Sequence, residues 1–376
     1  MPQNGDTNSN DKSGGILDTI LESEYTQALA DFNPDKLVSE FLGLLKDRER
    51  EILSLRYGLG DTESHTLEAI GKKLNLTRER VRQVEKDSLD LLRKQLSDAK
   101  FGKAMGVVKK TIEDHGGAFA EQDLIDHLLI GDKDSRKRNA LILMLELYDE
   151  LHYAKESKDM HPAWHITGFE FRRLDDFHKE LKFILEENKK PVSLDDLVSA
   201  FKKTELYQSN QKFFTDKVIE NLVKITKKIE SNPFGHYGLS HWRAIQPKDV
   251  GDKAYLVLQN LGKPEHYTKI TELINQHKFD NRTAYKETVH NELIMDPRFV
   301  LVGRGIYALT EWGYKKGVVS DVIKEVLAQS SEPMERNKII EEVLKRRIVK
   351  RNTILVGLAN KTMFKKVGKS KYTLAD

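Results

Sequence analysis

Between residues 66 and 96, apolar and polar positions follow two helical patterns that are separated by a tight break. Side chains three or four positions apart share one face of a helix, so apolar residues at this spacing predict a buried face. The inward positions are Leu67, Ile70 and Leu74 in the first helix, and Val81, Val84 and either Leu91 or Leu92 in the second. In the break, Asn75 can adopt the left-handed conformation of a short turn, and Thr77 is a good N-cap for the second helix. This pattern predicts a helix-turn-helix.

The opposite face of the second helix is polar and begins with long side chains. Arg78, Glu79, Arg82, Gln83 and Lys86 occupy it. In the major groove of DNA, Arg can pair with guanine, Glu can accept from cytosine and Gln can pair with adenine. Recognition helices place their N-terminal residues against base edges. Surface ion pairs on an exposed helix would explain any one of these residues, but the cap, the turn and the two-sided helix together indicate a helix that reads DNA.

The motifs LRYGL, HTLEAIG and TRERVRQVE lie within the run from Leu45 to Lys94. Through them this run closely resembles region four of the sigma-70 family of bacterial RNA polymerase sigma factors. The resemblance implies that residues 77–87 read the promoter −35 element and that the region contacts the flap tip of the polymerase β subunit. It implies base contacts by Arg78, Glu79 and Gln83. It also implies contacts with the DNA backbone by Arg48, Arg56, Leu67, Glu68, Thr77, Arg80 and Arg82.

Residues 1–40 precede this run and are polar and acidic, without Trp. A complete sigma factor has, upstream of region four, helices that bind the polymerase clamp and aromatic residues that capture the melted −10 strand. We therefore expect another protein to supply those parts if the chain acts in initiation.

Beyond residue 100 the chain repeats a pattern of helix, break, helix, helix and β-like ending. The breaks HGGAF, NKKPV, LGKPE and SSEPM are 73, 73 and 69 residues apart when Ala118, Pro191, Pro264 and Pro333 are aligned. The β-like endings are PAWHIT, SHWRAI, GIYALT and SKYTLA. Glycines at 303, 305 and 368 predict hairpin tips in the last two units. The first unit has no Gly four positions before its Trp, so we expect an irregular wing there. The order of elements is that of a winged helix.

The third unit carries the motifs KPEHYTKI, TAYKETVHNEL and DPRFVLVGRGIYALTEW. Through them it resembles the HARE-HTH family, a winged-helix module also present in the δ subunit of some bacterial RNA polymerases. We expect the middle units to serve architecture or protein contact, because a winged helix specifies a fold before it specifies a ligand.

Charge is distributed unevenly along the chain. The net charge is +3, but residues 1–40 hold eight acidic residues against two lysines, and residues 331–376 hold twelve basic residues against five acidic ones. A basic end favours a polyanionic partner, although uneven surface charge alone could produce it. We therefore expect a second DNA-contacting patch in the fourth unit, formed by Lys345, Arg346, Arg347, Lys350, Arg351, Lys365, Lys366, Lys369 and Lys371.

The sequence thus predicts a mainly α fold, a helix-turn-helix followed by four tandem winged-helix modules with small β-hairpin wings. The expected divisions are an acidic, largely disordered leader at 1–34, the region-four-like segment at 35–98, and winged-helix units at 101–170, 171–248, 250–314 and 316–376.

Residues that could form an active site are sparse. Pro162 separates His161 from His165, which argues against a zinc pair on one helix. Acidic residues beside His178 lie where a helix begins and serve as cap and dipole partners. There is no cysteine, no phosphate-binding loop and no stretch of 18 apolar residues. We expect no enzyme activity, no cofactor, no metal, no small-molecule substrate and no membrane partner, in a cytoplasmic, nucleoid-associated protein.

Two functions remain open at this point. In the first, the chain is a sigma-like transcription factor that binds double-stranded DNA at a −35-like element and contacts the β flap of core RNA polymerase. In the second, it is a stand-alone DNA-binding regulator or architectural protein without polymerase contact. The amphipathic segment 35–50 discriminates between them. Docking on polymerase predicts an exposed apolar surface there, whereas a solitary regulator could bury that surface against its own winged helices.

Overall fold

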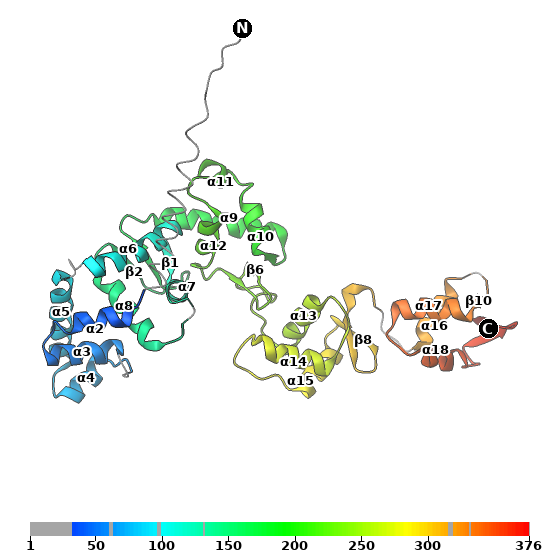
Figure 1. The fold of residues 1–376 in the computed structure, drawn as a ribbon. Helices are drawn as coiled ribbons and strands as arrows, with labels where there is room; N and C mark the ends of the chain where they lie inside the picture. The colour runs from blue at the N-terminus through cyan, green and yellow to red at the C-terminus, as the bar shows by residue number, and fades with distance from the viewer. Residues whose placement is uncertain are drawn as a thin grey trace, which may run out of the picture. The chain divides into compact units, whose positions relative to one another are not determined.

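The computed structural model describes residues 32–59, 63–95, 99–130, 132–314, 319–330 and 332–375, and almost all of the predicted leader lies outside them. The described chain is mainly helical, with small antiparallel sheets (Figure 1). It divides into two compact units. One comprises residues 1–184 and 195–229, and the other comprises residues 185–194 and 230–376.

The first described segment is a four-helix arrangement that contains the predicted helix-turn-helix. Its helices are α2 (Pro34–Leu42), α3 (Asp47–Tyr57), α4 (Leu67–Leu74) and α5 (Arg78–Gln95). A small core lies between α3, α4 and α5, made by Ile52, Leu55, Ile70 and Val81. Further along α5, Leu92 is buried at 1% exposure while Leu91 is 38% exposed, so the inward face continues through Leu92.

The next segment repeats the order helix, strand, helix, helix, strand, strand. Its elements are α6 (Ala99–Asp114), β1 (Ala118–Ala120), α7 (Glu121–Leu128), α8 (Ser135–Leu147), β2 (Leu151–Ala154) and β3 (Ala163–Ile166). The sheet has the order β1-β3-β2 and is antiparallel. Phe119 and Tyr153 both lie opposite Trp164 in this register. The connection between β2 and β3 is residues 155–162, and it takes the place of a tight hairpin in this segment.

Three further segments follow the same order, with one additional short helix, α11 (Glu205–Ser209), in the second and a 3-10 turn at the end of the third. The second comprises α9 (Phe171–Asn188), β4 (Val192–Ser193), α10 (Leu194–Phe201), α11, α12 (Asp216–Val223), β5 (Ile229–Ser231) and β6 (His236–Leu239). The third comprises α13 (Val250–Leu261), β7 (Glu265–His266), α14 (Tyr267–His277), α15 (Lys286–Met295), β8 (Phe299–Gly303), β9 (Ile306–Leu309) and the 3-10 turn η1 (Thr310–Trp312). The fourth comprises α16 (Val319–Ala328), β10 (Met334–Glu335), α17 (Arg336–Arg346), α18 (Arg351–Leu358), β11 (Phe364–Val367) and β12 (Lys371–Leu374).

Each break between helices supplies a short strand that the sequence pattern did not predict. In all four sheets this strand pairs with the last strand of its segment, so the last strand lies in the middle. The expected hairpin tips are turns in the third and fourth segments, where Gly305 and Gly368 have φ of 71° and 75°. Only a residue without a side chain adopts such angles at no steric cost. Gly303 does not lie in the tip as predicted, because it is the last residue of β8 and pairs with Ile306.

One β-like ending was predicted wrongly. Residues 240–245 form turns, and the strand β6 comes just before them. The amide of Trp242 donates to the carbonyl of Leu239, and the amide of Ile245 donates to that of Trp242. A Cβ added to Gly238 would lie 2.8 Å from both side chains. The aromatic ring therefore folds back over the glycine instead of extending the strand.

Candidate nucleic-acid interface

The turn between α4 and α5 is fixed by two capping residues. Asn75 ends α4 with φ 55° and ψ 47°, the left-handed conformation that its sequence position predicts. The hydroxyl oxygen of Thr77 accepts the amide of Arg80 at 3.1 Å, which confirms the predicted N-cap. Thr66 caps the start of α4 in the same way, by accepting the amide of Ala69 at 3.2 Å. The direction in which α5 leaves the protein is therefore set locally.

Gly71 lies in α4 and packs against this turn, and it was not singled out from the sequence. A Cβ at this position would lie 2.7 Å from the carbonyl oxygen of Leu76 and 3.5 Å from the amide nitrogen of Arg78. The amide of Leu76 also donates to the carbonyl of Gly71 at 2.8 Å. The turn thus folds directly onto α4. The signal was present, because this glycine ends the motif HTLEAIG.

The three residues expected to contact bases all lie exposed near the N-terminus of α5. These are Arg78, Glu79 and Gln83. Two of them are bonded to neighbours that are expected to contact the DNA backbone. The Arg82 guanidinium donates to both carboxylate oxygens of Glu79, at 2.9 Å from Nε and 2.6 Å from Nη2, while Arg80 lies 3.4 Å from the Gln83 side-chain oxygen.

The ion pair between Glu79 and Arg82 affects the charge on the exposed face of α5. The hydrogen bond from Arg82 lowers the pKa of Glu79, so this carboxylate is ionised and accepts hydrogen bonds near neutral pH. An ionised acceptor suits the amino group of cytosine. Because both groups are exposed, the pair itself adds little stability.

The residues expected to contact the DNA backbone differ in their exposure to solvent. Arg48, Glu68, Thr77, Arg80 and Arg82 are exposed, whereas Leu67 and Arg56 are partly buried.

Arg56 is held from two sides. Its Nε lies 3.0 Å from Glu85 and its Nη1 donates to the carbonyl of His65 at 3.3 Å. This partner on α5 was not predicted from the sequence, since 29 residues separate the two side chains.

The amphipathic segment 35–50 does not leave its apolar face open. Helix α2 packs against α8 of the following segment (Figure 1). Four apolar side chains of the segment, Val38, Phe41, Leu42 and Leu45, are 3 to 7% exposed and belong to one core with those of α6 and α8. Leu37 is partly buried against the same core. Leu44 alone among the large apolar residues of the segment is strongly exposed, at 51%.

Polar contacts reinforce this packing. The Asn139 side chain donates to the carbonyl of Gly58 at 2.9 Å, and Arg93 donates to the carbonyl of Glu146 at 3.0 Å. The hydroxyl of Tyr57 donates to the Glu146 carboxylate, and burial and this carboxylate raise the Tyr57 pKa. Leu53 of α3 and Leu92 of α5 also belong to the core that α2 shares with the following segment, whereas the small core between α3, α4 and α5 is a separate cluster.

The basic residues of the fourth segment are exposed with two exceptions. Lys345, Lys350, Arg351, Lys365, Lys366, Lys369 and Lys371 are exposed, and Arg346 is partly so. Arg347 differs, because it is 7% exposed and burial lowers its pKa. Its side chain is thus not presented to a phosphate in this conformation.

Two of the histidines considered for catalysis or metal binding, His165 and His178, have structural partners. His178 lies 2.9 Å from the carbonyl of Leu222, and the ring of His165 packs edge-on against Phe171. Among the residues that the structure describes, no cluster of three or more His, Asp or Glu side chains could hold a metal ion. Nor is any described helix long and apolar enough to cross a bilayer.

Comparison with known proteins identifies the helix-turn-helix. A family model described as "Sigma-70, region 4" matches residues 41–94. The RNA polymerase sigma factor SigA4 of Synechococcus elongatus is 52% identical over 56 residues, which are 15% of this chain and 18% of that protein. The sigma factor RpoS of Coxiella burnetii is 36% identical over 88 residues, or 23% of this chain and 25% of that protein. SigA of Lactococcus lactis subsp. cremoris is 39% identical over 80 residues, 21% of each chain.

The chain therefore spans a quarter or less of the length of these relatives. The matched residues include all of α3 and α4 and all of α5 except its last residue, with the capped turn and the exposed Arg78, Glu79 and Gln83 described above. Residues 41–94 are thus a sigma-70 region 4 domain, the DNA-binding helix-turn-helix of sigma factors, in a chain most of whose other residues lie outside this similarity.

Proposed function

We propose that the protein is a sequence-specific DNA-binding transcription factor that recognises a promoter −35-like element through residues 77–87. The proposal rests on the exposure of Arg78, Glu79 and Gln83 on α5, a helix whose start is fixed by the Thr77 cap. These side chains have the donors and acceptors that distinguish base pairs in the major groove. Arg48, Arg80 and Arg82 would hold the helix in register by phosphate contacts.

We further propose that the four later segments are tandem winged-helix modules. Their repeated element order and three-stranded sheets support this. The third would be a HARE-HTH-like module, and the fourth would contact the DNA backbone through its exposed lysines. In this function the chain binds without catalysis or cofactor, and acts on the nucleoid in the cytoplasm.

The role in transcription has two candidate forms. In the first, the protein acts in initiation and contacts core RNA polymerase through the β flap, as the region 4 similarity suggests. The second is a stand-alone regulator, and one observation favours it: α8 covers the apolar face of α2 that polymerase docking would leave open. Retention of core RNA polymerase by the immobilised full chain would support the first form, and loss of polymerase on washing at physiological salt would support the second.

Base reading is tested by two arginine substitutions. Arg78→Ala should weaken binding to a matched −35-like duplex by about 1 to 3 kcal/mol and relax preference at one G·C pair. Arg82→Ala should weaken matched and scrambled duplexes more evenly, because a phosphate contact carries no sequence information. Titration of both duplexes at one salt concentration measures these effects. Equal losses on the two duplexes for Arg78→Ala would remove base reading from the proposal.

A further inference from the structure

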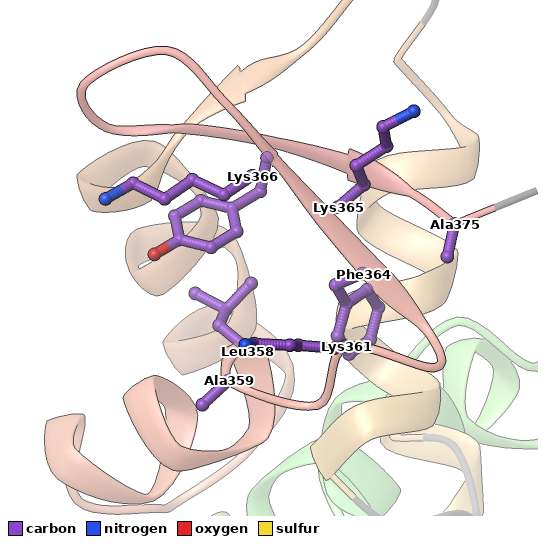
Figure 2. Close-up of a pocket in the computed structure, with 8 residues that line it drawn as sticks. Leu358, Ala359, Lys361, Phe364, Lys365, Lys366 and Ala375 are labelled. Atoms are coloured by element: carbon purple, nitrogen blue, oxygen red, sulfur yellow. The ribbon is translucent and has the colours of Figure 1, made fainter.

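A groove lies beside the hairpin of the fourth segment, away from the helix-turn-helix in sequence. It has a volume of about 440 Å³. Figure 2 shows side chains that line it, from the end of α18, the following connection and the hairpin strands. They are Leu358, Ala359, Lys361, Phe364, Lys365, Lys366, Tyr372 and Ala375. The volume is within the range of about 300 to 1,000 Å³ that small-ligand sites occupy.

The groove combines an apolar floor with a cationic border. Leu358 and Phe364 are each 3% exposed and belong to the core of the segment, and Tyr372 is partly buried beside them. Strand pairing sets Lys366 directly opposite Tyr372. Successive strand residues point to opposite faces, and Lys365 and Lys366 accordingly extend to opposite sides of β11 in Figure 2. Lys361 and Lys366 are both exposed.

This combination fits an unpaired nucleic acid strand better than a duplex. Proteins bind single strands by stacking bases on aromatic rings while basic side chains follow the phosphates. A duplex hides the faces of its bases, so a recess with an aromatic wall offers it no contact beyond charge. None of the described residues that line the groove is acidic, and lysines continue along the hairpin at 369 and 371. This series of cations suits a backbone that carries one charge per nucleotide.

We propose that the groove binds single-stranded DNA, with a base against Tyr372 and Leu358 and the adjacent phosphates at Lys361 and Lys366. The preference for DNA over RNA rests on the proposed function, which brings the chain to a promoter where strands separate. The groove itself does not depend on the helix-turn-helix.

The experiment measures fluorescence anisotropy of the full chain with a labelled single-stranded DNA oligonucleotide and with a duplex of equal length that lacks a −35-like element. Tyr372→Leu keeps an apolar side chain but removes the ring, and should weaken single-strand binding about tenfold while leaving duplex binding within about twofold. Tyr372→Phe keeps the ring and should bind as the wild type does. Lys366→Gln should weaken single-strand binding more than Lys369→Gln, the matched charge change outside the groove.

Other outcomes would overturn the proposal. Equal losses on single strand and duplex for Tyr372→Leu would leave only a general phosphate contact. Tighter binding of an RNA oligonucleotide of the same sequence would overturn the assignment to DNA, and capture of a polyglutamate peptide without capture of single-stranded DNA would assign the groove to acidic protein segments. Recognition of the −35-like element is measured on the matched duplex with Arg78→Ala, and this site is measured on single-stranded DNA with Tyr372→Leu, so a failure of one remains distinguishable from a failure of the other.

Discussion

Substitution of Gly71 by alanine has two opposite effects on stability, a gain in helix propensity and a steric clash. Alanine in a helix interior is more favourable than glycine by about 1 kcal/mol. At Gly71, however, the new Cβ would lie 2.7 Å from the carbonyl oxygen of Leu76. Overpacking of this kind costs about 1 to 3 kcal/mol. The contacted atom belongs to the backbone of the turn, so relief requires Thr77 and the start of α5 to move.

The clash should therefore outweigh the gain in helix propensity. We expect Gly71→Ala to destabilise the helix-turn-helix by up to about 2 kcal/mol, which is the overpacking penalty less the propensity gain. Because the displaced atoms position the first turn of α5, affinity for a matched −35-like duplex should fall more than affinity for a scrambled one.

Gly106 provides the matched control. It lies in the middle of α6, and no atom lies within 4 Å of the Cβ that alanine would add. Only the propensity gain of about 1 kcal/mol remains, so Gly106→Ala should stabilise its helix. Hydrogen exchange of the amides in residues 66–86 and 99–114 reports local stability where a single unfolding free energy for a chain of several units would not. If both substitutions slow exchange in their own helices and DNA affinity stays unchanged, the tight packing of the turn against α4 is refuted.

Three further predictions concern caps, a buried amide and pH. Thr77→Ala should remove the N-cap and destabilise the start of α5 by about 1 kcal/mol, seen as faster exchange of its first amides, whereas Thr77→Ser should not. Asn221→Ala should cost about 1 to 3 kcal/mol in denaturant unfolding, because this side chain, 4% exposed, donates to two backbone carbonyls at 2.8 and 2.6 Å; an unchanged midpoint would contradict this. Burial lowers the pKa of His115 and His127 below the unfolded pKa of about 6.5. The stability that the two neutral rings contribute is therefore complete above a pH of about 6.5. It is lost as the pH falls through their lower folded pKa values, because the unfolded state binds protons first. His127→Gln should flatten the decline in stability below that pH, and a decline as steep as in the wild type would exclude the histidine as its source.

The exposure of the residues expected to contact bases was foreseeable because it depends on local rules. Helical periodicity assigned Val81 to the core and Arg78, Glu79 and Gln83 to the surface, and the structure agrees. The same rules failed at Arg347, which belongs to a run of basic residues yet is buried. A charge run predicts exposure only on average, since neighbouring elements decide which member is covered.

The sequence by itself determined the elements whose causes lie within a few residues: the helices of the region 4 domain, the left-handed Asn75, the Thr77 cap and the glycine turns at 305 and 368. Tertiary structure alone decided that α8 covers the apolar face of α2, that Arg56 pairs with Glu85, and that each break becomes a strand. The apolar stripe of an amphipathic helix predicts that this face will be buried, but it does not predict which element will cover it. A strand needs a partner that, for β1 and β3, lies more than 40 residues away. Contacts over such distances arise only when the whole segment folds.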